Sequence, residues 1–394
     1  MARSDDKRSE RRPATRLAHL GRDKHLTGPF INPPVVHAST VLFDSVDDMI
    51  GGRQRYLYGR RGTPTSEALE SAIADLEGAA GTVICPSGLN AAATALLSCL
   101  ASGDHILVTD AVYEPVRRML DRTLAPLGIA TTYYDPLIGA AIESLFRSNT
   151  KAVYVESPGS LTFEMQDIPA IAAAAAKRNL TVIADNTWAT PIHFRPLAHG
   201  ADLSFLSGTK HIGGHSDLML GLVSAGSRTW SALKRTHGDL GICAGPDDIT
   251  LALRGLRTMA IRLERSMTSG VAVARWLEKR PEVARVLFPA LETDPGHGIW
   301  RRDMTGGCGL FGVVFKGWSD VRAKAFIEAL TLFGIGASWG GFESLAILAL
   351  PEKTRTAVEW RPAGPLVRLY IGLEDPEDLI ADLDAAFVST AGMS

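Results

Sequence analysis

The sequence has few cysteines and no long hydrophobic run. Its 394 residues include four widely spaced cysteines without a CxxC pair, and its histidines show no metal-ligand spacing. The apolar runs are much shorter than the roughly 20 residues that span a bilayer. Residues 1–12 mix both charge signs, lack the apolar stretch of a secretion signal and are predicted to form a disordered tail. We therefore expect a soluble, cytoplasmic protein without a metal site.

The sequence also lacks a strong charge of either sign. The net charge is -2, with 21% charged and 46% hydrophobic residues, so we expect a small-molecule partner and neither nucleic acid nor membrane. The length exceeds what one hydrophobic core usually serves. We predict an N-terminal arm over residues 1–60, an α/β domain over 61–258 and a smaller C-terminal α/β domain over 259–394.

Short β-type runs alternate with helical patterns over residues 67–207, which is typical of βα units on a largely parallel sheet. The strands expected there cover residues 82–85, 105–109, 151–155, 181–184 and 201–206, and the helices cover 90–101 and 168–177. A long helical region interrupted at Gly255 is expected over 247–278. The segment after it is expected to contain strands over 310–315 and 366–371 and a last helix over 376–387.

Ser87, Gly88 and Leu89 lie where the first of these strands turns into a helix. A glycine there lets backbone N–H groups approach an anion, and the helix dipole favours the same anion. The turn therefore indicates a phosphate site. The alternative is an ordinary βα turn.

Asp185 and Lys210 follow two further strands, at the sheet edge where open α/β proteins bind ligands. The Asp185 carboxylate can hold the proton of a pyridinium ring, or it can simply cap a turn. Ser207 and Thr209, close to Lys210, offer hydroxyl groups to a phosphate. A lysine partly removed from water can act as a Schiff-base nucleophile and proton shuttle. The alternative is a solvated surface lysine.

Two other segments offer ligand-binding groups. Tyr58 and Arg60, in the arm, supply a hydroxyl and a guanidinium suited to a phosphate, or they form a solvated basic loop. Tyr113 follows the strand over 105–109 and can lie against a flat heterocycle; the alternative is a tyrosine that packs in the core or is partly exposed.

The C-terminal segment holds a candidate carboxylate clamp. Arg368 can bind a substrate carboxylate through two parallel hydrogen bonds, with Ser338 and Trp339 completing the pocket. The alternative for Arg368 is a structural salt bridge.

From about residue 17 onward the chain resembles the Cys/Met-metabolism family of fold-type-I pyridoxal-phosphate enzymes. The motifs that carry the resemblance are Tyr58-Gly59-Arg60-Arg61-Gly62-Thr63, Tyr113-Glu114-Pro115, Tyr134-Asp135-Pro136-Leu137-Ile138-Gly139, Glu156-Ser157-Pro158-Gly159-Ser160, Asp185-Asn186-Thr187-Trp188, Thr209-Lys210, Gly214-His215-Ser216-Asp217, Ser338-Trp339-Gly340-Gly341 and Ile371-Gly372-Leu373-Glu374-Asp375.

The resemblance implies the fold of the PLP-dependent transferases, with a mostly parallel central sheet, a smaller C-terminal α/β domain and pyridoxal 5'-phosphate bound by residues 61–258. It implies that Lys210 is the catalytic Schiff-base lysine, that Asp185 pairs with the pyridinium nitrogen and that Tyr113 stacks on the ring. It also implies a homotetramer built from two dimers that share active sites. The remaining implied contacts are Gly88, Leu89, Ser207 and Thr209 around the phosphate, Tyr58 and Arg60 on the phosphate of a neighbouring subunit, and Arg368, Ser338 and Trp339 at the substrate carboxylate.

The reaction implied by the resemblance is β-elimination on L-cystathionine, a carbon–sulfur lyase reaction that yields homocysteine, pyruvate and ammonia. Relatives acting at the γ-carbon usually carry a leucine in place of Trp339, and methionine γ-lyases place a catalytic cysteine where Pro115 stands. Gly238, in contrast, falls where β-lyases carry a pocket tyrosine. The alternatives are a γ-lyase, γ-synthase or sulfhydrylase with the same cofactor, or a regulatory protein that binds it.

Overall fold

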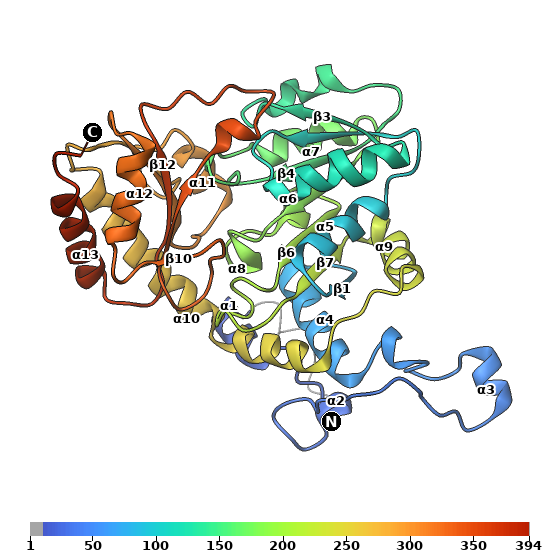
Figure 1. Cartoon of the computed structure of the whole chain (residues 1–394). Coiled ribbons are helices and arrows are strands. Elements are labelled where there is room, and N and C mark those ends of the chain that lie inside the picture. The colour runs from blue at the N-terminus through green and yellow to red at the C-terminus, as the bar shows by residue number, and fades with distance from the viewer. Residues whose placement is uncertain (1–10, 394) are drawn as a thin grey trace.

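The computed structural model describes residues 11–393, so residues 1–10 of the predicted tail lie outside the described range. A seven-stranded sheet forms the centre, in the order β1-β7-β6-β5-β4-β2-β3 (Figure 1). Its strands are β1 (Gly81–Cys85), β2 (His105–Thr109), β3 (Ala130–Tyr134), β4 (Thr150–Glu156), β5 (Thr181–Asp185), β6 (Leu203–Ser207) and β7 (Gly221–Ala225).

The central sheet is mostly parallel, as predicted. Strands β3, β2, β4, β5 and β6 pair in parallel, whereas β7 runs antiparallel to both β1 and β6. The carboxyl ends of β4, β5 and β6 therefore meet at one edge. Strands β3 and β7 were not predicted from the sequence.

Helices cover both faces of this sheet because successive strand residues face opposite sides. In β4, Val153 packs in the core cluster that contains α4, α7 and α10, while Tyr154 packs in the cluster that contains α5, α6 and α9. The helices are α4 (Pro64–Glu77), α5 (Gly88–Leu97), α6 (Glu114–Met119), α7 (Ile168–Ala176), α8 (Thr190–His193), α9 (Ser227–Asp239) and α10 (Pro246–Leu277). The short 3₁₀ helices are η2 (Gly59–Arg61), η4 (Ala125–Leu127), η5 (Gly139–Leu145), η6 (Pro196–His199) and η7 (Pro351–Lys353), and η3 (Leu120–Leu124) is a π-helix.

The C-terminal part contains the second, smaller sheet, in the order β10-β11-β12-β9-β8. Its strands are β8 (Val283–Leu287), β9 (Leu310–Phe315), β10 (Gly334–Ile335), β11 (Leu345–Ala349) and β12 (Leu366–Tyr370), and its helices are α11 (His297–Asp303), α12 (Asp320–Ala329) and α13 (Pro376–Ser389). The predicted strands over 310–315 and 366–371 correspond to β9 and β12.

Helix α10 corrects one prediction, because it continues through Gly255 without interruption. A Cβ added at Gly255 would lie 2.2 Å from the carbonyl oxygen of Ile212. The glycine therefore lets the helix pack closely against the loop after Lys210, at a cost in helix propensity of about 1 kcal/mol relative to alanine. Residue 258, the proposed domain boundary, lies inside α10, and the boundary stays a prediction.

The N-terminal arm projects from the body of the molecule and includes α2 (Lys24–Thr27) and α3 (Val46–Gly51), after α1 (Pro13–His19), which packs on α10 (Figure 1). Large apolar side chains are exposed along it: Phe30, Ile31, Leu42, Val46, Met49 and Ile50. Within residues 11–393, every helix is too short or too polar to cross a membrane.

Candidate active site

Lys210 lies in the turn that follows β6, at the carboxyl edge of the central sheet. Its Nζ donates a 2.6 Å hydrogen bond to Ser338 Oγ and lies 5.4 Å from the centre of the Trp339 ring. The facing loop can come this close because a glycine is present: a Cβ added at Gly340 would lie 3.0 Å from Lys210 Cα, and Gly340 has a φ of 87°. Folding thus brings together a lysine and a serine that are 128 residues apart in the chain.

The surroundings of Lys210 make its amine more reactive. Burial, with a smaller contribution from the charge of Arg368, lowers the pKa of Lys210 to about 8. A lysine with this pKa is partly neutral near neutral pH. It is therefore suited to act as a nucleophile or a general base.

Asp185 is the last residue of β5 and is oriented by Thr187. The backbone N–H and the hydroxyl of Thr187 both donate to Asp185 Oδ1, at 2.9 and 2.5 Å. Asp185 Oδ2 forms no hydrogen bond within the described residues, so it is available to a ligand. The Thr187 hydroxyl also accepts from the backbone N–H of Ser207 at 3.0 Å, which links the acid to the turn that leads to Lys210.

Glu156 lies beside Asp185, because the two residues are paired at the ends of β4 and β5. Burial raises the pKa of Asp185 to about 6, although the two hydrogen bonds from Thr187 act to lower it. Burial and the charge of Asp185 raise the pKa of Glu156 further above its ordinary value. Of the two carboxyl groups, Glu156 therefore loses its proton less readily, and Asp185 is the one that more readily carries the negative charge.

Tyr113 is connected to this pair of carboxyl groups through its backbone, whose N–H donates to Glu156 Oε2 at 2.8 Å. It precedes α6, and its side chain is 47% exposed. The ring is therefore partly exposed, which excludes packing in the hydrophobic core but is also the state of an ordinary partly exposed tyrosine. An exposed ring beside the sheet edge remains open to a flat ligand.

The turn between β1 and α5 lies against Ser207. A Cβ added at Gly88 would lie 2.7 Å from Ser207 Oγ, so only glycine fits there. The side chain of Ser87 caps α5 by accepting from Asn90 N, and the first N–H groups of the helix, those of Gly88 and Leu89, have no intrahelical partner. Together with the Ser207 hydroxyl, these groups are suited to bind an anion at a helix N-terminus.

Thr209, which stays a predicted phosphate contact, also forms hydrogen bonds within its own turn. Its hydroxyl accepts from the backbone N–H of Leu220 at 2.9 Å and donates to the carbonyl of the same residue at 3.1 Å. The Thr209 side chain therefore fixes the turn that carries Lys210.

Arg368, in β12, is a buried arginine with no carboxylate partner within the described residues. Its Nη2 reaches the carbonyl oxygens of residues 336–338 at 3.0–3.4 Å, while its Nε is buried and has no partner. Burial lowers the pKa of Arg368 to about 10, so it stays charged at neutral pH. A buried cation with an unused donor is suited to bind a carboxylate, and no structural salt bridge accounts for it.

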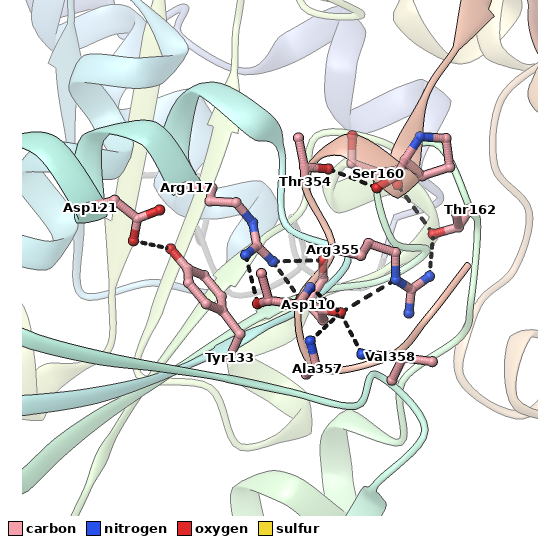
Figure 2. Close-up of polar contacts among 12 residues, drawn as sticks. Asp110, Arg117, Asp121, Tyr133, Ser160, Thr162, Thr354, Arg355, Ala357 and Val358 are labelled. Atoms are coloured by element: carbon pink, nitrogen blue, oxygen red, sulfur yellow. Dashed lines mark hydrogen bonds and ion pairs between the residues drawn. The ribbon is translucent and has the colours of Figure 1, made fainter. Parts of the chain in front are cut away.

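Asp110 joins the segment that carries Tyr113 to the loop that precedes β12 (Figure 2). Its fully buried side chain accepts from Arg117 Nη2 at 2.6 Å and from the backbone N–H groups of residues 356–358 at 2.9–3.2 Å. Arg355 lies 3.5 Å from it and also pairs with Glu164. Burial acts to raise the pKa of Asp110, but these hydrogen bonds hold it below its ordinary value.

Two predicted residues are not brought to this site by their own chain. Tyr58 is 46% exposed. Arg60 donates from Nη1 to the carbonyl of Gly238 at 2.8 Å, next to the end of α9. Both lie in the arm that projects from the body.

The donors and acceptors left free at this edge fit a phosphorylated pyridine cofactor and a carboxylate substrate. They are an amine of lowered pKa, one free carboxylate oxygen, a helix N-terminus with a hydroxyl, and a buried arginine. Thr187, Glu156 and Asp110 were given no individual role from the sequence. Their positions at or shortly after the ends of strands were the available signal, but their contacts depend on pairing between distant segments.

Comparisons with known proteins agree with this geometry. Residues 14–388 match the family described as Cys/Met metabolism PLP-dependent enzyme. A Rhizobium johnstonii protein named putative cystathionine beta-lyase is 52% identical, with 96% of both chains covered. Escherichia coli cystathionine beta-lyase MetC is 41% identical over 95% of this chain and 97% of its own. The structure of cystathionine gamma-lyase from Lactobacillus plantarum complexed with L-serine superposes with a TM-score of 0.88, at 29% identity over 96% of this chain and 99% of that chain.

Proposed function

The chain belongs to the Cys/Met metabolism PLP-dependent enzyme family, and we propose that this carbon–sulfur lyase catalyses β-elimination on L-cystathionine. The products are homocysteine, pyruvate and ammonia, with one water consumed. The observation that carries the proposal is the contact of Lys210 with Ser338, whose carbonyl also binds Arg368. This contact joins a reactive amine to a carboxylate-binding group.

The cofactor is held by groups already in place. Asp185 would pair with the pyridine nitrogen through its free oxygen, Tyr113 would cover the ring, and Gly88, Leu89, Ser207 and Thr209 would bind the phosphate. Thr209 holds the turn that carries Lys210. When bound, pyridoxal phosphate supplies the electron sink that makes the α-proton of an amino acid acidic.

Lys210 performs the proton transfers. Its neutral Nζ takes the α-proton from the substrate, and the resulting ammonium gives a proton to the departing homocysteine sulfur. The lowered pKa of Lys210 suits both roles, because the amine can exist in either protonation state near neutral pH. Ser338 holds Nζ at the sheet edge between these steps.

Arg368 orients the substrate by binding its α-carboxylate, with Ser338 and Trp339 beside it. The charge of the guanidinium is uncompensated by any carboxylate of residues 11–393. Binding of a carboxylate therefore supplies the missing partner of a buried cation. Trp339, whose ring lies near Lys210, favours reaction at the β-carbon, because relatives that act at the γ-carbon usually carry a leucine at this position.

Incubating the purified enzyme with L-cystathionine distinguishes the sibling reactions by their products. We expect equal amounts of pyruvate and homocysteine, because breaking the Cβ–S bond leaves the three-carbon fragment as the keto acid. 2-Oxobutyrate with cysteine would identify γ-elimination instead. Absence of any keto acid, with turnover of an activated homoserine and a thiol, would identify a replacement reaction and contradict the proposal.

We also propose a cytoplasmic homotetramer in which the arm of one subunit completes the site of its neighbour. The exposed apolar side chains of the arm support this arrangement, since a patch of this kind usually marks an interface. The separation of Tyr58 and Arg60 from Lys210 in one chain supports it as well. The four free cysteines suit a reducing compartment.

Mixing two inactive variants tests the shared site. After co-expression or subunit exchange, R60A and K210A chains are expected to recover about a quarter of wild-type activity, because half of the dimers are mixed and each mixed dimer has one intact site. Mixtures that stay inactive although mixed assemblies form would contradict sharing. A monomeric mass in solution would also contradict it.

A further inference from the structure

Glu77, the last residue of α4, has a carboxyl group enclosed beneath the central sheet. The residue is 1% exposed, and Oε1 accepts a 2.9 Å hydrogen bond from Ser204 Oγ in β6. Oε2 is buried without a partner. Within residues 11–393 no cation forms an ion pair with Glu77. An ionised carboxylate in this position would be strongly destabilising.

Asn186, directly after Asp185, contacts the Glu77 side chain. Its Nδ2 donates to the carbonyl of Phe194 at 2.9 Å, and its Oδ1 is buried without a partner. Turning the amide over would place Oδ1 against that carbonyl, so one N–H of Nδ2 is committed to Phe194 and the amide keeps this orientation. Two residues in contact thus each have a buried acceptor oxygen that lacks a donor, and one proton on Glu77 would supply a donor.

Asp110 shows what a buried anionic carboxylate requires in this fold. It is equally enclosed, but it receives hydrogen bonds from arginine and from three backbone N–H groups (Figure 2). Glu77 has none of these donors. Its neighbours Ser204 and Asn186 are neutral, and the charged group that acts on it, Arg195, packs against the backbone of Gly78.

We propose that Glu77 keeps its carboxyl proton in the folded protein and is a neutral positioning residue that ties the end of β5 to β6. Its hydroxyl donates from Oε2 while Oε1 accepts from Ser204. The contact fixes the strands that carry Asp185 and lead to Lys210. This positioning role rests on the proposed function, whereas the presence of the proton does not.

The pKa of Glu77 agrees with this geometry. Burial raises it to about 7 from an ordinary value of 4.5. The hydrogen bonds of Ser204 and Asn186 act to lower the pKa, but their effect is smaller. A carboxyl group whose pKa is higher in the folded than in the unfolded state stabilises the fold. This stabilisation is complete below pH 4.5 and is lost as the pH rises through about 7.

The proton is tested by infrared spectroscopy of the wild-type apoprotein and its E77Q variant at about pH 6. We expect the difference spectrum to contain the C=O stretching band of one protonated carboxyl group, lost in E77Q. A carboxylate band in its place would overturn the proposal. This measurement needs no cofactor and no activity, so its failure is distinguishable from failure of the proposed function.

The pH dependence of unfolding gives a second test with a matched control. Between pH 4.5 and 7 the unfolding equilibrium of the wild type relative to E77Q should shift toward the unfolded state by about tenfold per pH unit, because glutamine keeps the donor and the acceptor but does not titrate. D110N, which removes an ionised acceptor, should instead differ from the wild type by a constant factor over this range. Parallel curves for E77Q and the wild type would overturn the proposal.

The positioning role is tested on the holoenzyme. E77L removes the donor and the acceptor. We expect it to shift the pH profile of the visible cofactor absorbance and to raise the Kd for the cofactor. E77Q should restore both to wild-type values. A wild-type profile in folded E77L would show that Glu77 does not position the site.

Discussion

Replacing Lys210 by alanine is expected to abolish the visible absorbance of bound cofactor and to lower kcat by roughly 10⁴-fold or more. The substitution removes the covalent attachment and the general base at once. No other lysine replaces it, because Lys210 is the lysine that contacts Ser338 and Trp339 in the described chain. The visible spectrum and single-turnover kinetics measure the two effects separately.

The matched control is K234A, which removes an exposed lysine that lies 5.8 Å from the Trp230 ring on α9. This variant should keep the spectrum and the turnover of the wild type. Substantial β-elimination by K210A, with a spectrum like that of the wild type, would refute the role assigned to Lys210. Loss of both properties in K234A as well would point to an unspecific effect of the substitution.

Replacing Arg368 by methionine is expected to lower kcat/KM by roughly 30- to 5,000-fold, which corresponds to about 2–5 kcal/mol for the loss of one partner of a buried charge pair. The loss should appear mainly in KM, because the guanidinium binds the substrate carboxylate before and during the reaction. Cofactor affinity should change little. Steady-state kinetics and a cofactor titration measure these quantities.

R280M is the control for Arg368. Arg280 is a partly buried arginine that pairs with Glu282 and Asp384, away from the candidate site. It should keep the kinetic constants of the wild type. R368K should lie between R368M and the wild type, since lysine keeps the charge but loses the fork of donors. An unchanged KM in R368M would exclude the carboxylate clamp.

The sequence predicted those parts of the fold that are set by local patterning. Strands β2, β4, β5 and β6 combine β-type residues with flanking turns, and the structure has them where the pattern indicated. Strand β7 was missed because its five residues, Gly221–Ala225, contain small residues and follow a glycine-rich segment. Its antiparallel direction depends on pairing with β1 and β6, which no local signal encodes.

In the candidate site, too, some features follow from local sequence patterns and others depend on distant segments. Asp185 is the last residue of β5 and Lys210 lies in the turn after β6, so their arrival at one edge follows from the topology of a parallel sheet. The contact of Lys210 with Ser338 and the raised pKa of Glu156 depend on packing between segments that are far apart in sequence. The uninterrupted α10 is a similar case, because the packing of Gly255 against the Lys210 loop outweighs its low helix propensity.

The anchoring of the loop before β12 by backbone N–H groups has an evolutionary consequence. Because Asp110 accepts from the backbone N–H groups of residues 356–358, these bonds do not depend on the side chains there, although the Thr356 hydroxyl also accepts from Arg117 Nη1 at 3.2 Å. Proline is the exception, since it has no N–H to donate. Neutral drift in this loop can therefore proceed without moving the arginine that the following strand carries.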